Sequence, residues 1–362
     1  MVEGPLAGAG ELAVDSVRVR VDLAYDGAGF SGWAAQPGRR TVEGVLSEAL
    51  GHVLRLPGAV RLTVAGRTDS GVHARGQVAH ADMPADAWGT HAGAALRRLA
   101  RALPPDIRVR SAGVAPPGFD ARFSALWRRY AYRICDEPAR ADPLRRFDTL
   151  WSPRSLDLGA MNEAARLLLG EHDFAAFCRK REGATTVRAL RRLEWERGAD
   201  GVAVGCVVAD AFCHNMVRAL VGALIPVGEG SRPTGWPAQV LREAVRDPGV
   251  QVVPPHGLSL EEVRYPEPEQ LAARAALTRQ VRGADLSLLP GLPGCLDYLL
   301  VDDALAVLLA LVVGAHPVTI RWLRSGLAVP DTRSLLKCSS WLSSAVVVGS
   351  VPLTNSAQVR IR

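Results

Sequence analysis

The chain of 362 residues is longer than one typical domain, and its 48% hydrophobic content is ordinary for a protein with a sizeable buried core. Its formal charge is +6 and its basic residues are almost all arginine, which suits contacts with phosphates and bases, so a polyanionic partner is favoured. The cysteines form no CxxC pair and no regular framework, which argues against a disulfide scaffold.

The N-terminus and the cysteines indicate a cytoplasmic protein with reduced thiols. Residues 1–16 are rich in glycine and alanine and lack the basic start and apolar run of a signal peptide. Cys213 and His214 are adjacent, but a metal site needs several ligands at defined spacings, and no second cluster accompanies them. We therefore expect no metal site, and mostly buried thiols at Cys135, Cys178, Cys206, Cys213, Cys295 and Cys338.

The first predicted elements are a strand, a helix and a second, interrupted strand. Apolar and polar residues alternate over residues 17–23, which is the pattern of a half-buried strand. Thr41 is placed to cap a helix over residues 42–54, where apolar side chains recur at helical spacing. The second strand is expected over residues 62–64 and again over residues 77–82, with a polar, glycine-flanked segment between them.

Prolines and a glycine at residues 116–118 punctuate the chain and predict a boundary between two domains. Beyond this boundary, the patterns predict strand, helix, strand and helix over residues 127–134, 161–169, 202–208 and 216–224. Because the strands are short and irregularly separated by helices and turns, we expect an α+β fold with antiparallel sheets.

The predicted organisation has four parts. A flexible tail (1–16) precedes an N-terminal α+β domain (17–115), a C-terminal α+β domain (116–266) and an extension of unknown structure and role (267–362). The most apolar run of the extension, residues 304–315, is only about half the length that crosses a bilayer. We therefore predict no transmembrane segment there.

Five motifs occur in an order that resembles one known family. The polar segment that interrupts the second strand has an Arg-Thr-Asp core between glycines, which allow a tight loop that a ligand can reach. The motifs are Gly32-Trp33-x-x-Gln36, Gly66-Arg67-Thr68-Asp69-Ser70-Gly71-Val72-His73-Ala74, Arg128-Arg129-Tyr130-x-Tyr132, Phe212-x-His214-x-Met216-Val217-Arg218, and Gly257-Leu258 to Tyr265-Pro266. Over residues 17–266 the chain resembles the TruA family of tRNA pseudouridine synthases.

The resemblance implies a pseudouridine synthase fold, with two mixed domains, helices on antiparallel sheets and a central basic cleft. It also implies an isomerase that converts uridine to pseudouridine in the anticodon stem-loop of tRNA, at positions 38, 39 and 40, by base flipping. No metal or organic cofactor is implied, and a homodimer is expected from the family alone. Folded RNA is largely recognised by shape and backbone, so we expect specificity to come from tRNA shape and the basic cleft.

Asp69 is the predicted nucleophile. The isomerisation needs a group that assists cleavage of the glycosidic bond and re-attachment of the base through carbon, and a carboxylate can do this covalently. The reference pKa of aspartate is about 3.9 and a nearby guanidinium lowers it by roughly 1–3 units, so no activating histidine is required. Taken alone, the pattern favours an aspartate that caps a turn, and the accompanying motifs shift the interpretation to catalysis.

The resemblance gives roles to three more side chains. Arg67 helps to displace the target base and takes its place in the stack, Tyr130 packs on the flipped uracil, and Arg218 keeps Asp69 charged and oriented. Each has a simpler structural alternative: Arg67 would form an ion pair within its loop, Tyr130 would be a core tyrosine, and Arg218 would be a surface arginine on an amphipathic helix. His73, four residues after Asp69, is expected to be structural or to contact RNA.

Two other functions compete with this interpretation. A non-catalytic RNA-binding or RNA-folding protein would keep the cleft without turnover, but the intact set of predicted site residues argues against it. A metal-dependent hydrolase with Asp69 as a ligand would need neighbouring carboxylates or histidines that the sequence lacks. Further basic residues are compatible with phosphate contacts, but such clusters are usually solvated, and none is counted as a site: Arg39, Arg40, Arg128, Arg129, Arg179, Lys180 and Arg181.

Overall fold

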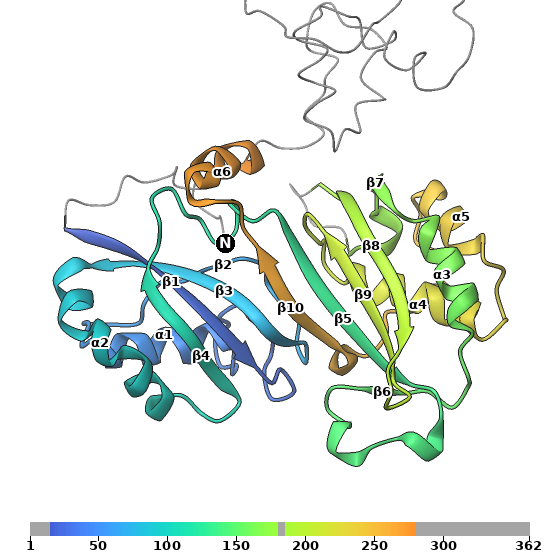
Figure 1. The fold of residues 1–362 in the computed structure, drawn as a ribbon, viewed down its shortest axis with the longest axis horizontal. Coiled ribbons are helices and arrows are strands. Elements are labelled where there is room, and N and C mark those ends of the chain that lie inside the picture. Colours follow the sequence, from blue (N-terminus) through green and yellow to red (C-terminus); the bar gives the residue numbers. More distant parts are fainter. Residues whose placement is uncertain (1–14, 180–184, 280–362) are drawn as a thin grey trace, which may run out of the picture. The chain divides into compact units, whose positions relative to one another are not determined.

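The computed structural model describes residues 15–179 and 185–279 (Figure 1). Within these residues ten strands form one sheet: β1 (Ser16–Tyr25), β2 (Thr63–Val64), β3 (His73–Pro84), β4 (Ile107–Val114), β5 (Trp127–Cys135), β6 (Leu150–Trp151), β7 (Gly170–Asp173), β8 (Val187–Arg197), β9 (Ala203–Ala209) and β10 (Leu258–Arg264). The same residues contain six α-helices: α1 (Val42–Val53), α2 (Ala85–Ala102), α3 (Leu158–Arg166), α4 (Met216–Gly228), α5 (Trp236–Glu243) and α6 (Leu271–Arg279).

The sheet runs through both halves of the sequence. Its strand order is β4-β1-β3-β10-β5-β9-β8-β7, with β2 paired to β3 and β6 paired to β5. The pairs β10–β3 and β5–β6 are parallel and the other pairs are antiparallel. The expected α+β fold is therefore confirmed. Strand β10, from the end of the second predicted domain, pairs with β3 from the first, and a domain boundary at residues 115 and 116 stays a prediction.

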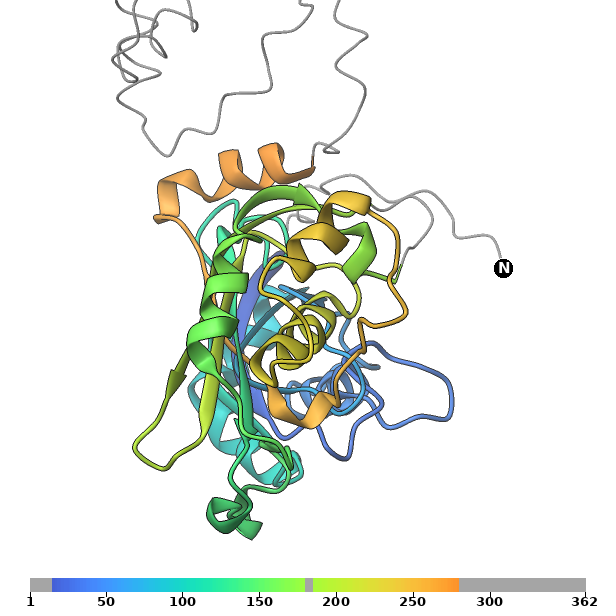
Figure 2. The same cartoon turned by 90° about the vertical axis from the view of Figure 1, so that its right-hand side faces the viewer.

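Alternation along β1 determines which face of the sheet is covered. Val19 and Val21 are fully buried, whereas Arg18 and Arg20, which alternate with them, are partly exposed on the opposite face. The Thr41 hydroxyl accepts a hydrogen bond from the Gly44 amide at 3.3 Å, so the predicted N-cap of α1 is confirmed. Figures 1 and 2 show α1 and α4 against the same face of the sheet.

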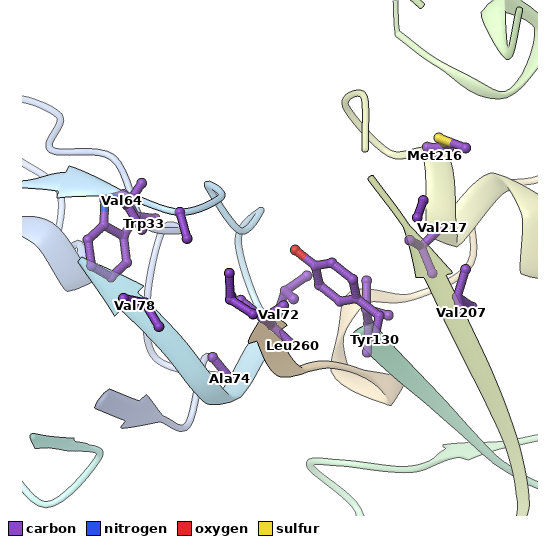
Figure 3. Close-up of a cluster of buried hydrophobic side chains, with 14 of the residues drawn as sticks. Trp33, Val64, Val72, Ala74, Val78, Tyr130, Val207, Met216, Val217 and Leu260 are labelled. Carbon is purple, nitrogen blue, oxygen red and sulfur yellow. The ribbon is translucent and has the colours of Figure 1, made fainter. Parts of the chain in front are cut away.

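The hydrophobic core crosses from the first half of the chain to the second. Val78 of β3, Leu260 of β10 and Tyr130 of β5 lie in one cluster with Val207 of β9 and Val217 of α4 (Figure 3). Each fully buried Val or Leu side chain of such a core contributes roughly 1.5–3 kcal/mol. Packing on this scale holds loops from the two halves of the sequence in one fixed arrangement.

The expected elements are present, with ends that differ by a few residues, but seven helices and strands were not predicted: α2, β4, β6, β7, β8, α5 and α6. In α2 only Trp88, Ala95 and Leu99 are buried, and two glycines weaken the helical signal. In β8 a bulge between Leu190 and Arg192 breaks the alternation that marks a strand. Strand β4 has an irregular burial pattern and directly precedes the predicted boundary.

The extension that begins at residue 267 contains a folded helix. Leu271 of α6 is buried, and its carbonyl oxygen accepts a hydrogen bond from Ser124 Oγ at 3.1 Å. Arg279 pairs with Asp120 at 2.9 Å. The predictions for residues 1–14 and 280–362, including the apolar run at 304–315, lie outside the described residues. No helix in the described part of the chain is long and apolar enough to cross a membrane.

Candidate active site

Asp69 lies in the loop between β2 and β3. A buried hydrogen-bond network connects this loop to side chains of the sheet and holds it in place. Tyr25 OH is 2.7 Å from Thr68 Oγ1, and Gln77 Nε2 donates to Tyr25 OH at 3.1 Å and to the Gly66 carbonyl at 3.0 Å. Burial raises the pKa of Tyr25 to about 12, so its phenol stays neutral. A buried hydroxyl left without a partner costs about 1–3 kcal/mol, so the network favours one loop conformation.

The segment around Gly32 holds the other side of the loop. The Trp33 amide donates to the Thr68 carbonyl at 3.0 Å, and Ser70 Oγ donates to the Phe30 carbonyl at 3.1 Å. Gly32 has a φ of +93°, and a Cβ atom there would lie 2.9 Å from the Thr68 carbonyl oxygen. Glycine therefore meets both the backbone conformation and the close approach. The Gly32-Trp33 motif and the Asp69 loop form one structural unit.

The carboxylate of Asp69 faces the segment that precedes α4. His214 Nε2 lies 3.4 Å from Asp69 Oδ1, and the two side chains are 22% and 30% exposed, respectively. His214 Nδ1 is buried, with no hydrogen-bond partner in residues 15–179 or 185–279. The carboxylate is thus oriented by a neighbour on one side and remains accessible to a substrate.

Tyr130 of β5 is close enough to Asp69 for the carboxylate to influence its pKa. It is only 7% exposed, and its ring meets the Phe212 ring edge-on, with 5.1 Å between centroids and 86° between planes. Burial raises the pKa of Tyr130, and the proximity of Tyr25 and of the Asp69 carboxylate raises it further, so the phenol stays protonated. Figure 3 shows Tyr130 between Val72 and Val217, where the two halves of the core meet. Its burial also fits the core-tyrosine alternative.

Arg218 lies in the first turn of α4 and is half-buried rather than a surface arginine. Its Nε donates to the Val253 carbonyl at 2.6 Å, and its Nη1 lies 3.4 Å from Asn215 Oδ1. Burial lowers the pKa of Arg218, and the negative charge of Asp69 opposes this shift. Among the described residues Asp69 forms its ion pair with His214, while Arg218 is close enough to feel the charge of Asp69. The predicted role of Arg218 in keeping Asp69 charged and oriented stays a prediction.

Arg67 is exposed and has no recorded hydrogen bond or ion pair with any residue that the structure describes. The alternative of a loop ion pair is therefore not formed within this part of the chain. Its guanidinium is accessible from solvent.

His73 has a structural contact. It is buried, and its Nδ1 accepts a hydrogen bond from the Gly27 amide at 3.0 Å. This fits the expected structural role, while a contact with RNA stays a prediction. The histidine beside the carboxylate is instead His214, which the sequence suggested only as a metal ligand. His214 lies in the same sequence motif as Arg218, and this proximity was the feature that could have indicated a role at the site.

One expectation about the cysteines is wrong. Cys178 and Cys213 are joined by a disulfide, with their Cα atoms 5.8 Å apart. The two are 35 residues apart in sequence, and the chain segments meet through the Arg179 amide, which donates to the His214 carbonyl at 3.0 Å. Cys135 and Cys206 are free thiols. Within residues 15–179 and 185–279, no group of three or more His, Cys, Asp or Glu side chains is arranged to hold a metal ion.

The site thus gathers groups from separate elements around an accessible carboxylate. The β2–β3 loop supplies Asp69 and Arg67, β5 supplies Tyr130, and the segment at the start of α4 supplies His214 and Arg218. A carboxylate beside a neutral aromatic ring and two basic side chains is suited to nucleophilic attack on a planar, ring-containing substrate.

Comparisons with known proteins agree with this arrangement. Residues 164–266 match the family model described as tRNA pseudouridine synthase. A tRNA pseudouridine synthase A from Streptomyces griseus is 61% identical over 280 residues, which cover 77% of this chain and 96% of the relative. The relative of that name from Frankia casuarinae is 63% identical over 266 residues, covering 74% and 96%. That from Mycobacterium leprae is 50% identical over 283 residues, covering 75% and 97%.

Proposed function

This chain belongs to the tRNA pseudouridine synthase A family and isomerises uridine in tRNA, and on that premise we propose that Asp69 is the nucleophile and that the targets are uridines 38, 39 and 40 of the anticodon stem-loop. The observation that supports the nucleophile best is the accessible Asp69 carboxylate, which lies 3.4 Å from His214 Nε2 and close enough to the buried Tyr130 to raise its pKa. The positions within tRNA rest on the resemblance of the motifs alone.

In the proposed reaction the target uridine leaves the stack and enters the site. Arg67, exposed at the edge of the loop, takes the place of the displaced base, and the uracil packs against Tyr130. Stacking on an aromatic side chain contributes about 1–3 kcal/mol per base, which is comparable to the unstacking cost. Binding energy from the rest of the tRNA then holds the base near Asp69.

The carboxylate of Asp69 assists cleavage of the bond between uracil N1 and ribose C1′. The detached uracil turns, and a bond forms between C5 and C1′. The hydrogen on C5 passes to water, and N1 gains a proton. The nucleoside keeps its elemental composition and oxidation state, so the isomerisation needs no oxidant or reductant. Arg218 and His214 stabilise and orient the carboxylate on the side away from the substrate.

Two wider properties are part of the proposal. The family resemblance supports a homodimer, which the mass in solution tests. An enzyme that modifies tRNA is expected in the cytoplasm, where its substrate is matured, and fractionation of cells tests this location.

Release of tritium from tRNA transcripts that contain [5-³H]uridine tests the proposed positions. Each isomerisation expels the hydrogen on C5, so release by the wild-type protein counts the modified uridines. Transcripts with cytidine at positions 38, 39 and 40 should give no release above background. Full release from these transcripts would place the targets elsewhere in tRNA and overturn the positional part of the proposal.

A further inference from the structure

Arg128 is a buried cation at the centre of the site's framework. The sequence placed it among basic residues compatible with phosphate contacts, but it is only 6% exposed. It lies on β5 two residues before Tyr130, so both side chains point to the same face of the sheet. An RNA phosphate cannot reach this guanidinium without unfolding its surroundings.

Its guanidinium binds three backbone carbonyls from three separate segments. Nη2 donates to the Ala65 carbonyl at 2.7 Å and to the Arg122 carbonyl at 2.7 Å, and Nη1 donates to the Asp210 carbonyl at 2.5 Å. Ala65 directly precedes the Asp69 loop. Asp210 directly follows β9 and precedes the segment that holds Phe212 and His214.

A guanidinium is well suited to binding three backbone carbonyls at once. It is planar, stays charged and offers several N–H donors in fixed directions, whereas the three donors of an ammonium radiate from one nitrogen on a flexible stem. Burial lowers the pKa of Arg128, which shows how strongly the surroundings desolvate it. Burial of a charged group is unfavourable unless hydrogen bonds compensate for the lost solvation. A buried arginine at residue 128 is therefore expected to have a specific structural role.

We propose that Arg128 is a positioning residue that holds the Asp69 loop and the Phe212–His214 segment at the separation the reaction needs. The inference rests on the proposed role of Asp69. Arg128 touches no reacting atom. It acts through Ala65 on one side and through Asp210 on the other, and these anchor the segments that bring His214 to 3.4 Å from Asp69.

The proposal predicts a loss in turnover rather than in tRNA binding. A displacement of about 1 Å between reacting groups lowers a rate by roughly 100-fold, while the tRNA-binding surface outside the two segments is unaffected. We expect Arg128→Lys to reduce kcat by tenfold or more and to leave KM and tRNA affinity within about threefold. Arg128→Ala should lose more activity, and added millimolar guanidinium chloride should restore part of it by occupying the vacated space.

Arg129→Lys is the matched control. Arg129 is the next residue on the same strand, but its side chain points to the opposite face and pairs with Glu262 at 3.1 Å, partly exposed to solvent. The same exchange there removes a surface guanidinium and should change kcat by less than twofold, because exposed ion pairs contribute little.

The experiment measures tritium release from [5-³H]uridine tRNA at saturating and subsaturating tRNA, with thermal unfolding and tRNA binding followed in parallel. Asp69→Asn is included because loss of its activity tests the underlying function separately. An inactive Asp69→Asn, together with a folded Arg128→Lys that binds tRNA but turns over slowly, supports the proposal. If Asp69→Asn is inactive but Arg128→Lys has the kcat of Arg129→Lys, or loses only tRNA binding, Arg128 does not position the site. An active Asp69→Asn would instead refute the proposed function itself. Arg128→Lys decides the question even if Arg128→Ala does not fold.

Discussion

His214 Nε2 lies 3.4 Å from Asp69 Oδ1, although the two residues are separated by most of the folded sequence. The contact joins the β2–β3 loop to the segment before α4, and it is the recorded ion-pair contact of Asp69 within the described residues. The Asp69 carboxylate therefore has His214 as a neighbour, while part of the carboxylate remains exposed to solvent.

We expect His214→Ala to lower kcat by about tenfold, because Asp69 would lose the neighbour that orients it. His214→Asn, which keeps a polar group at a similar reach, should retain more activity. Single-turnover tritium release under saturating enzyme would measure this difference directly. Equal, wild-type rates for both variants would mean that the contact has no part in the reaction.

Tyr130→Leu should reduce kcat/KM by roughly 10- to 100-fold, because the base would lose about 1–3 kcal/mol of stacking. Phe212 should be less sensitive, because its ring meets Tyr130 edge-on and supports it from the side. Steady-state kinetics of Tyr130→Leu and Phe212→Leu would compare the two. A larger loss at Phe212 would indicate that the base packs on Phe212 instead.

Tyr25→Phe should destabilise the protein by about 1–3 kcal/mol, because Thr68 and Gln77 would each lose a buried hydrogen-bond partner. The loop that carries Asp69 is the part affected, so turnover should fall together with the melting temperature. Calorimetry and tritium release on the same preparation would test this coupling. Unchanged stability would show that the network is not a fixed part of the fold.

Folding stability should fall with decreasing pH because of His80. Burial lowers the pKa of His80 to about 4 from a usual value of 6.5, and its Nδ1 accepts a hydrogen bond from the Ala121 amide. The unfolded chain therefore binds a proton between pH 6.5 and 4 that the folded chain does not, so stability is lost across this window as pH falls. The loss from this group is about 2–3 kcal/mol.

Urea unfolding of the wild type and of His80→Asn at several pH values would check this dependence. The asparagine amide has no titrating group, so the variant should show a smaller stability loss between pH 6.5 and 4. Parallel curves for the two proteins would assign the pH dependence to other groups.

The sequence predicted the parts of the fold that depend on local patterns. The alternation in β1 and the Thr41 cap of α1 appear in the structure as expected, because both follow from neighbouring residues. The strand β8 was missed because its bulge breaks the alternation, and the helix α2 because few of its residues are buried. The Cys178–Cys213 pair was missed because only the folded chain brings these segments together.

The candidate site shows the same division. Motifs predicted Asp69, Tyr130, Arg67 and Arg218 as site residues, but they could not reveal which side chain contacts the carboxylate. The structure places His214 there and keeps Arg218 bound to the Val253 carbonyl. It also turns Arg128 from a supposed surface cation into a buried one. Burial and partners depend on tertiary packing, which residue types alone do not specify.

The most direct test of the account compares Asp69→Asn with the wild type for release of tritium from [5-³H]uridine tRNA. Asp86→Asn, an exposed aspartate in the first turn of α2, serves as the control for the same exchange. We predict release by the wild type and by Asp86→Asn, and none above background by Asp69→Asn, which should still bind tRNA. Release by Asp69→Asn at the wild-type rate would contradict the assignment of Asp69 as the nucleophile.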